Sequence, residues 1–190
     1  MSVRPAPSVN VLTAITYLRV VLVPIVMGLI LLGPRDDRAW VAAAVLFAAA
    51  ALTDFVDGFL ARRWALTTTL GSFLDTTADK LLASGALIAL VEVDRASAWI
   101  VAVIVGRELL ILGLRGVVAA DGTVFAPSIW GKLKTNVQFV AILLAILRWD
   151  EPLGPLLLDE WAMLAAAFVT VMSAVEYLTR FASALVSPKR

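Results

Sequence analysis

The sequence contains no cysteine and no histidine among its 190 residues. Without cysteine it forms no disulfides, and without either residue it cannot build thiolate or imidazole metal sites. The same absence excludes serine–histidine and cysteine–histidine catalysis. Any catalytic or metal-binding chemistry must therefore use carboxylates, amines, guanidinium groups, tyrosine or aliphatic hydroxyl groups.

Charged residues are also scarce. They make up 16% of the chain, whereas soluble domains contain about 25%. Hydrophobic residues make up 61%, and the formal net charge is only +1. So small a charge provides no basic surface for a nucleic acid. We therefore expect a membrane protein that does not bind nucleic acid.

Six apolar stretches divide the chain. Each is close to the roughly 20 residues that a helix needs to cross the hydrocarbon core of a bilayer. A helix also satisfies its own backbone hydrogen bonds in lipid. The stretches are residues 11–33, 39–61, 72–92, 97–118, 132–149 and 159–184. The sequence thus predicts an all-α integral membrane protein with six transmembrane helices, forming a single domain over residues 1–190.

The basic residues predict how these helices are oriented, because cytoplasmic loops are enriched in lysine and arginine. On one side of the membrane lie Arg4, Arg62, Arg63, Arg115, Lys132, Lys134, Lys189 and Arg190. On the other side lie only Arg35, Arg38, Arg95 and Arg148. Both termini should therefore face the cytoplasm. On the opposite side, acidic residues such as Asp159 and Glu160 should only keep the loops in water. Arg19, within the first span, should extend toward the membrane surface.

Four aspartates lie in or beside the apolar stretches: Asp54, Asp57, Asp75 and Asp79. A carboxylate within a membrane costs about 2.5–3.5 kcal/mol, which makes each one a functional candidate. The first pair is three residues apart and the second pair four, so in helices each pair shares a face. Four unpaired carboxylates facing each other would raise one another's pKa values. Two divalent cations would cancel this repulsion, and oxygen ligands favour Mg²⁺ or Mn²⁺.

Other residues near the aspartates suit a phosphorylated substrate. Gly58, Ala61 and Gly71 leave space on the same helix faces, either for a ligand or for close helix packing. Arg62 adds a cation beside the carboxylates. Carboxylates, divalent ions and an arginine together fit a phosphate or diphosphate. Alternatively, the aspartates are boundary residues or ion-pair partners of nearby basic side chains.

The segment 54–79 reads Asp54-x2-Asp57-Gly58-x2-Ala61-Arg62-x8-Gly71-x3-Asp75-x3-Asp79. This pattern resembles the signature of the CDP-alcohol phosphotransferase family. The resemblance implies a six-helix membrane enzyme, usually a homodimer. It also implies cleavage of the diphosphate of a CDP-linked lipid such as CDP-diacylglycerol, transfer of the phosphatidyl group to an alcohol, and release of CMP.

The resemblance implies roles for matching positions of this chain. Asp54, Asp57, Asp75 and Asp79 would hold two Mg²⁺ or Mn²⁺ ions, and Asp79 would also be the general base that takes the proton of the acceptor hydroxyl. The residues that would receive the cytidine diphosphate moiety are Gly58, Ala61, Arg62, Thr68, Asn10 and Thr13. Asn10 and Thr13 could equally cap the first helix, and Thr68 could be part of an ordinary polar loop.

The acceptor alcohol is less clearly marked. The segments Gly106-Arg107-Glu108-Leu109-Leu110 and Trp130-Gly131-Lys132-Leu133-Lys134-Thr135 are similar to the bacterial phosphatidylglycerophosphate synthase branch of the family. That branch uses sn-glycerol 3-phosphate in the cell membrane, with the active site facing the cytoplasm. The resemblance extends from about residue 10 to residue 148, and the last span adds little.

The basic side chains of these segments could bind the dianionic phosphate of such an acceptor. The candidates are Arg107, Arg115, Lys132 and Lys134. Alternatively, Arg107 is held in a buried salt bridge, for which Glu108 should be a poor partner because adjacent helical residues point apart. The two lysines could instead be anchors at the cytoplasmic membrane surface.

Several alternatives remain open from the sequence. Asp75-Thr76-Thr77-Ala78-Asp79-Lys80 departs from the usual Asp-Pro-Val-Ala-Asp-Lys of the branch. Within the family, the acceptor could instead be inositol phosphate, or phosphatidylglycerol to give cardiolipin. Outside the family, the chain could be a divalent-cation transporter or a non-catalytic assembly factor. Arg62 would repel a passing cation, and the complete aspartate set argues against an assembly factor.

Overall fold

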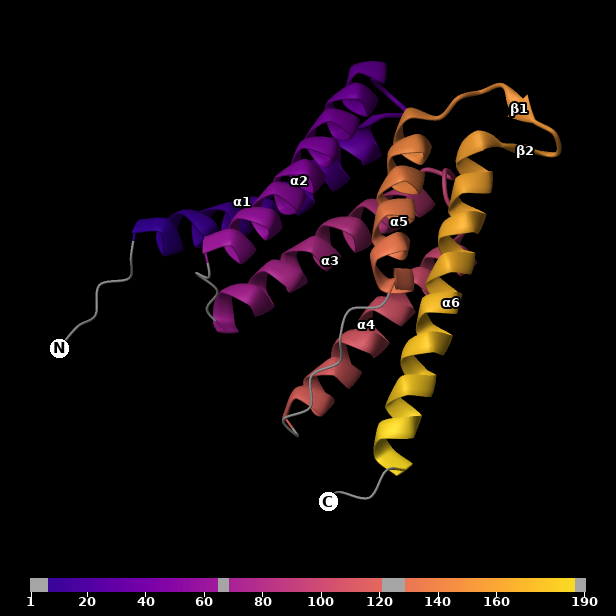
Figure 1. The fold of residues 1–190 in the computed structure, drawn as a ribbon. Helices are drawn as coiled ribbons and strands as arrows, with labels where there is room; N and C mark the ends of the chain where they lie inside the picture. Colours follow the sequence, from indigo (N-terminus) through magenta and orange to yellow (C-terminus); the bar gives the residue numbers. More distant parts are fainter. Residues whose placement is uncertain (1–6, 65–68, 121–128, 187–190) are drawn as a thin grey trace. The chain divides into compact units, whose positions relative to one another are not determined.

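A computed structural model describes residues 7–64, 69–120 and 129–186, with side chains for residues 17–53, 77–118, 129–131 and 133–182. The described chain is almost entirely helical, as predicted (Figure 1). The helices are α1 (Pro7–Leu32), α2 (Asp37–Trp64), α3 (Thr69–Glu92), α4 (Ala98–Ala120), α5 (Ile129–Leu147) and α6 (Leu158–Val186). One helix overlaps each apolar stretch.

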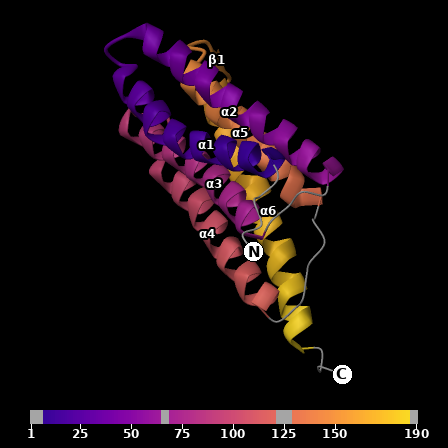
Figure 2. The same cartoon turned by 90° about the vertical axis from the view of Figure 1, so that its left-hand side faces the viewer.

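The chain divides into two compact units, Met1–Arg95 and Ala96–Arg190. In the first unit, α1 packs along both α2 and α3 (Figure 2). Its core consists of fully buried apolar side chains, among them Val26, Ile30, Phe47, Leu82 and Leu87. The expectation of one domain over residues 1–190 stays a prediction.

The turn between α1 and α2 follows from local sequence chemistry. Gly33 closes the last turn of α1 through its N–H, which donates to the carbonyl of Leu29 at 3.0 Å. Pro34 cannot continue the helix because it has no N–H. Asp36 then caps α2, since its Oδ1 accepts a hydrogen bond from the Arg38 N–H at 3.0 Å.

The indole ring of Trp40, near the start of α2, lies beside residues that follow the ends of α1 and α3. The Arg95 guanidinium, just beyond α3, lies 3.5 Å from the ring centroid, which is a cation–π contact. Just beyond α1, a Cβ atom built on Gly33 would overlap the ring. Glycine is therefore required at position 33 so that the backbone can approach the indole.

In the second unit, α6 packs along both α5 and α4. A small antiparallel hairpin, β1 (Pro152–Leu153) and β2 (Leu156–Leu157), connects α5 to α6, and Gly154 turns it with a φ of 75°. Asp159 was expected to lie in a solvated loop, and this expectation is wrong. It lies in the first turn of α6, is buried, and pairs with Arg148 at 3.3 Å.

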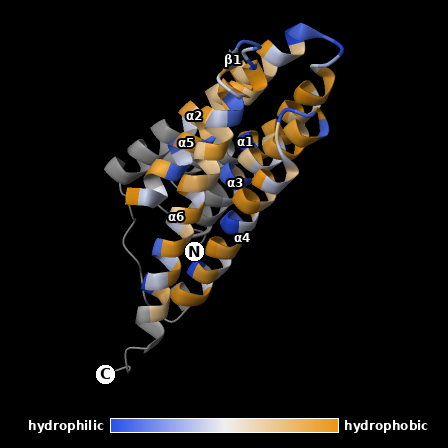
Figure 3. Cartoon of the chain, turned by 90° about the vertical axis from the view of Figure 1, so that its right-hand side faces the viewer, coloured by the Kyte–Doolittle hydropathy of each residue, from blue (hydrophilic) through white to orange (hydrophobic). Residues whose placement is uncertain are grey.

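The helices consist largely of apolar residues (Figure 3). Exposed side chains include Val41, Val45, Leu109 and Phe168. Apolar surface of this extent is typical of proteins that contact lipid or other proteins. Among the described residues, two segments, Ile129–Leu147 and Leu158–Ala182, are long and apolar enough to cross a membrane. That all six helices do so stays a prediction.

We predict that Gly33→Ala lowers the thermal unfolding temperature of the protein in detergent, measured by circular dichroism. The added methyl group would push against a ring that Arg95, just beyond α3, contacts from another side. Overpacking of this kind costs about 1–3 kcal/mol. Gly28→Ala, within the preceding helix α1, is the control, because a Cβ atom there meets no atom within 4 Å. If both variants unfold at the temperature of the wild type, the proposed contact is unimportant.

Candidate active site

The four signature aspartates lie on two consecutive helices of the first unit. Positions 54 and 57 belong to α2, and positions 75 and 79 belong to α3. Both segments are continuous helix, so each pair of positions lies on one helix face. The helices contact each other and run in opposite directions (Figures 1 and 2). The side chains of Asp54, Asp57 and Asp75 lie outside the described residues.

The aspartate positions also lie at similar depths in this pair of helices. Position 54 is ten residues before the end of α2, and position 79 is ten residues after the start of α3. At about 1.5 Å per residue, both are roughly 15 Å from the helix ends that the short connection joins. Positions 57 and 75 are seven and six residues from those ends. The backbone is thus compatible with two facing pairs of carboxylates.

The donor set is chemically suited to the expected metals. Four carboxylates are hard oxygen ligands, which fit Mg²⁺ or Mn²⁺. Asp79 is half-buried and is the one signature aspartate whose side chain is described. Within the described part of the chain, no three histidine, cysteine, aspartate or glutamate residues group together to hold a metal ion. The two-metal site therefore stays a prediction.

The residues expected to receive the nucleotide lie at helix ends of the first unit. Gly58, Ala61 and Arg62 are in the last turns of α2, and Thr68 lies outside the described residues. Asn10 and Thr13 lie inside α1, which begins at Pro7. Neither is therefore at the N-cap position, and the alternative that they cap this helix is not supported.

A buried arginine accompanies the aspartates in the first unit. Arg19, on α1, is 2% exposed. The expectation that this side chain extends to the membrane surface is therefore wrong. Its stretch of α1 belongs to a helix that packs on α3 as well as α2, so the side chain is enclosed by protein. The first unit thus buries a cation that was expected at the membrane surface.

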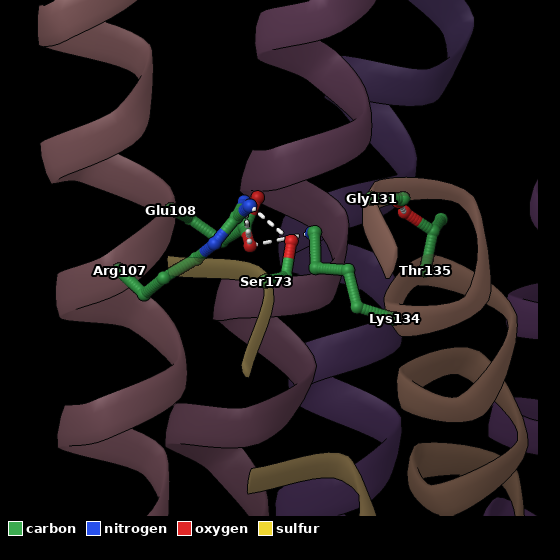
Figure 4. A network of polar contacts seen from close by, with 6 residues as sticks. All are labelled: Arg107, Glu108, Gly131, Lys134, Thr135 and Ser173. Atoms are coloured by element: carbon green, nitrogen blue, oxygen red, sulfur yellow. Dashed lines mark hydrogen bonds and ion pairs between the residues drawn. The ribbon is translucent and has the colours of Figure 1, made fainter. Parts of the chain in front are cut away.

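Two of the four expected acceptor-binding residues meet in the second unit (Figure 4). Arg107 from α4 and Lys134 from α5 both contact Oε1 of Glu108, at 3.2 Å and 2.5 Å. The three side chains are almost fully buried, with exposed fractions of 9%, 7% and 4% for Arg107, Lys134 and Glu108. Lys134 is therefore not a surface anchor.

The expectation that Glu108 is a poor partner for Arg107 is wrong. Adjacent helical residues do leave the backbone in different directions. An arginine side chain is long, however, and its guanidinium here bends back to the neighbouring carboxylate (Figure 4). Burial makes this pairing necessary, because an unpaired charge away from water is costly.

A serine of the last helix completes the cluster. Nη2 of Arg107 donates a hydrogen bond of 2.7 Å to Oγ of Ser173 on α6. No role was expected for this helix from its sequence. A signal was present, since Thr170, Ser173 and Tyr177 recur at the three- and four-residue spacing of one helix face, and all three are buried.

The other two candidates do not join this cluster in the described structure. Arg115 is exposed, and its guanidinium lies 5.6 Å from the ring centroid of Tyr177. It is eight residues beyond Arg107, which corresponds to about 12 Å along the helix. The side chain of Lys132 lies outside the described residues.

The cluster contains groups that can bind an anion. Two cations, Arg107 and Lys134, both contact one oxygen atom of the Glu108 carboxylate. Nε of Arg107 is buried and has no hydrogen-bond partner among the described residues. Arginine and lysine in such a setting are typical ligands of a phosphate dianion.

Known proteins are similar to this chain over most of its length. The model of the CDP-alcohol phosphatidyltransferase family matches residues 9–172. A Bacillus subtilis (strain 168) protein named CDP-diacylglycerol–glycerol-3-phosphate 3-phosphatidyltransferase is 42% identical over 184 residues, which cover 90% of this chain and 94% of that protein. A Salmonella choleraesuis (strain SC-B67) protein of the same name is 38% identical, with coverages of 90% and 93%. A Mycobacterium tuberculosis (strain ATCC 25618 / H37Rv) protein named probable phosphatidylglycerophosphate synthase is 40% identical, with coverages of 90% and 81%.

We predict that Glu108→Gln destabilises the protein far more than Glu176→Gln does. The first substitution leaves two buried cations without their shared carboxylate, and breaking a buried ion pair costs about 3–5 kcal/mol. Glu176 pairs with Arg180 near the surface of α6, where such pairs contribute about 1 kcal/mol or less. Thermal unfolding of both variants in the same detergent checks this. Equal losses of stability would contradict the structural role given to Glu108.

Proposed function

Because the chain belongs to the CDP-alcohol phosphatidyltransferase family, we propose that it transfers the phosphatidyl group of CDP-diacylglycerol to sn-glycerol 3-phosphate. The products are phosphatidylglycerophosphate and CMP. The choice of acceptor is supported by one observation: Arg107 and Lys134 both form buried salt bridges with Glu108. A phosphorylated acceptor needs such a cationic cluster, and the names of the relatives state the same reaction.

The carboxylates of the signature carry the donor chemistry. Asp54, Asp57, Asp75 and Asp79 would hold two divalent ions, Mg²⁺ or Mn²⁺. When bound, these ions neutralise the diphosphate and stabilise the leaving CMP. Gly58 and Ala61 leave space for the cytidine diphosphate moiety, with Asn10, Thr13 and Thr68 as further contacts, and Arg62 provides a cation for its phosphates.

Asp79 acts on the acceptor. An alcohol is a weak nucleophile until a base within hydrogen-bond reach removes its proton. The acceptor oxygen forms a bond to the phosphatidyl phosphorus while the bond from that phosphorus to the CMP oxygen breaks. The hydroxyl proton passes to the Asp79 carboxylate, and CMP leaves with the electron pair. No histidine is present to take this role.

The acceptor phosphate is recognised by its charge. Arg107 offers several N–H donors in one plane, and Lys134 offers a mobile ammonium group. Arg115 and Lys132 are further cations for the same substrate. Inositol phosphate would need similar groups and is the second candidate acceptor, whereas phosphatidylglycerol carries no dianionic phosphate. The buried cluster therefore favours a phosphate monoester.

The protein works in a bilayer. We propose that all six helices span the bacterial cell membrane, with both termini and the active site at the cytoplasmic side, and that the protein is a homodimer. The shortest helix has 19 residues, which corresponds to roughly 28 Å, close to the thickness of a hydrocarbon core. The distribution of lysine and arginine supports the orientation, and the family resemblance supports the dimer.

The first prediction from this proposal concerns the acceptor and the base. Purified protein with CDP-diacylglycerol and Mg²⁺ should release CMP when glycerol 3-phosphate is added, and Asp79→Asn should lower kcat by a factor of about 100 or more, because general-base catalysis contributes about 10²–10⁴-fold. Asp94→Asn is the matched control, since Asp94 lies beyond α3 with a φ of 54°, a conformation that asparagine tolerates.

Comparison of acceptors decides the specificity. Glycerol 3-phosphate, inositol 1-phosphate and phosphatidylglycerol would be assayed side by side. CMP release with inositol 1-phosphate alone would retain the family chemistry and overturn the choice of acceptor. Release with phosphatidylglycerol alone would show that the buried cations do not bind the acceptor phosphate.

The second prediction concerns the metal. Removal of divalent ions with EDTA should abolish CMP release, and addition of Mg²⁺ or Mn²⁺ should restore it, because carboxylates prefer these hard ions. Binding of Mn²⁺ can be followed directly by electron paramagnetic resonance, in wild type and in Asp54→Asn. Full activity in EDTA, or two bound Mn²⁺ ions in the variant, would refute the metal assignment.

A further inference from the structure

Ser173 is a buried hydroxyl on α6, and its partner is an arginine 66 residues earlier in the chain. Resting on the proposed function, we propose that Ser173 is a positioning residue for the acceptor phosphate. It does not touch the substrate. It holds the Arg107 guanidinium in the orientation that receives the phosphate monoester.

The hydrogen bonds of Arg107 define this orientation. Nη1 donates to Glu108 Oε1 at 3.2 Å, and Nη2 donates to Ser173 Oγ at 2.7 Å. A planar group held at both of its terminal nitrogens cannot rotate about its long axis. Nε remains without a hydrogen-bond partner among the described residues. The guanidinium thus keeps donors for a further anionic ligand.

The neutral charge of Ser173 matters as much as its position. A second carboxylate at this place would also hold Arg107, but it would cancel the charge that attracts the phosphate. A hydroxyl accepts the hydrogen bond and adds no negative charge beside the guanidinium. Glu108 already pairs with both Arg107 and Lys134, and an uncharged second partner for Arg107 adds no further negative charge. The cluster therefore combines a guanidinium of fixed orientation with a second cationic side chain, which suits a dianion.

Burial makes the serine hard to replace. Ser173 is 1% exposed, and the side chain of Arg107 is 9% exposed. A helical serine often bonds the carbonyl of its own helix, whereas Ser173 accepts from α4. If the hydroxyl is lost, bulk water has little access to the Nη2 donor and cannot easily replace it. The guanidinium then keeps one hydrogen-bond partner instead of two.

The same helix provides a matched control. Thr170 lies one turn before Ser173 on α6 and is fully buried. Its Oγ1 has no hydrogen-bond partner among the described residues. Thr170→Val therefore removes a buried hydroxyl from the same helix without removing a contact to Arg107. Ser173→Ala and Thr170→Val together separate the positioning role from general packing of α6.

The experiment measures steady-state kinetics of the full chain in detergent–lipid micelles with CDP-diacylglycerol and glycerol 3-phosphate. Ser173→Ala should raise KM for glycerol 3-phosphate about tenfold, as expected for loss of one hydrogen bond to a charged group. KM for CDP-diacylglycerol and kcat should stay close to the wild-type values. Thr170→Val should match the wild type in all three constants.

A double variant tests whether Ser173 acts through Arg107. Arg107→Gln should raise KM for glycerol 3-phosphate, and Arg107→Gln with Ser173→Ala should show the same KM, because the serine then has no guanidinium to hold. If these variants turn over too slowly, stabilisation by glycerol 3-phosphate in thermal unfolding replaces KM as the readout. If Ser173→Ala raises this KM by the same factor in Arg107→Gln as in the wild type, the inference is overturned.

Other results separate this inference from the proposed function. If the wild type does not use glycerol 3-phosphate, the proposed function fails, and the inference fails with it. If the wild type uses it and Ser173→Ala leaves its KM unchanged, only the inference fails. If Ser173→Ala raises the KM values of both substrates, or if Thr170→Val has the same effect, Ser173 has a structural role only.

Discussion

The pairing of buried charges is the constraint on which the second half of this protein depends. Glu108, Arg107 and Lys134 come from two helices of very apolar composition and are almost fully removed from water. Each would be costly there without a partner. The shared carboxylate offsets that cost, and Ser173 of α6 adds an uncharged partner for the arginine. The apolar contacts of α6 with α4 and α5 thereby bring polar groups from three helices to one place.

The chemistry of the two units differs in a way that matches a transfer between two phosphorylated substrates. The first unit carries carboxylates on α2 and α3, which suit divalent ions and a nucleotide diphosphate. The second unit carries the cationic cluster, which suits a phosphate monoester. Because the chain contains no histidine or cysteine, the base cannot be an imidazole or a thiolate. Carboxylates in the first unit and cations in the second are thus the main functional groups of the proposed reaction.

Some features were predictable because they depend on neighbours in the sequence. Apolar runs of about 20 residues predict helices, and the structure has one helix for each run. The spacing of Asp54 and Asp57, and of Asp75 and Asp79, predicts shared faces once the segments are helical. Burial was less predictable. Arg19, Asp159 and Lys134 are all enclosed by protein, although each was given a possible place at a membrane surface or in a solvated loop.

The sequence by itself determined the family, the helical architecture and the kind of chemistry, because a signature of fixed spacing and the absence of histidine and cysteine are properties of the chain order and composition. Only the tertiary structure decided which cations act together. Lys134 meets Glu108 across 26 residues, and Ser173 meets Arg107 across 66. Helical periodicity relates residues within one or two turns. Contacts over longer separations depend on which helix faces pack together, and that is decided by the sum of many apolar contacts.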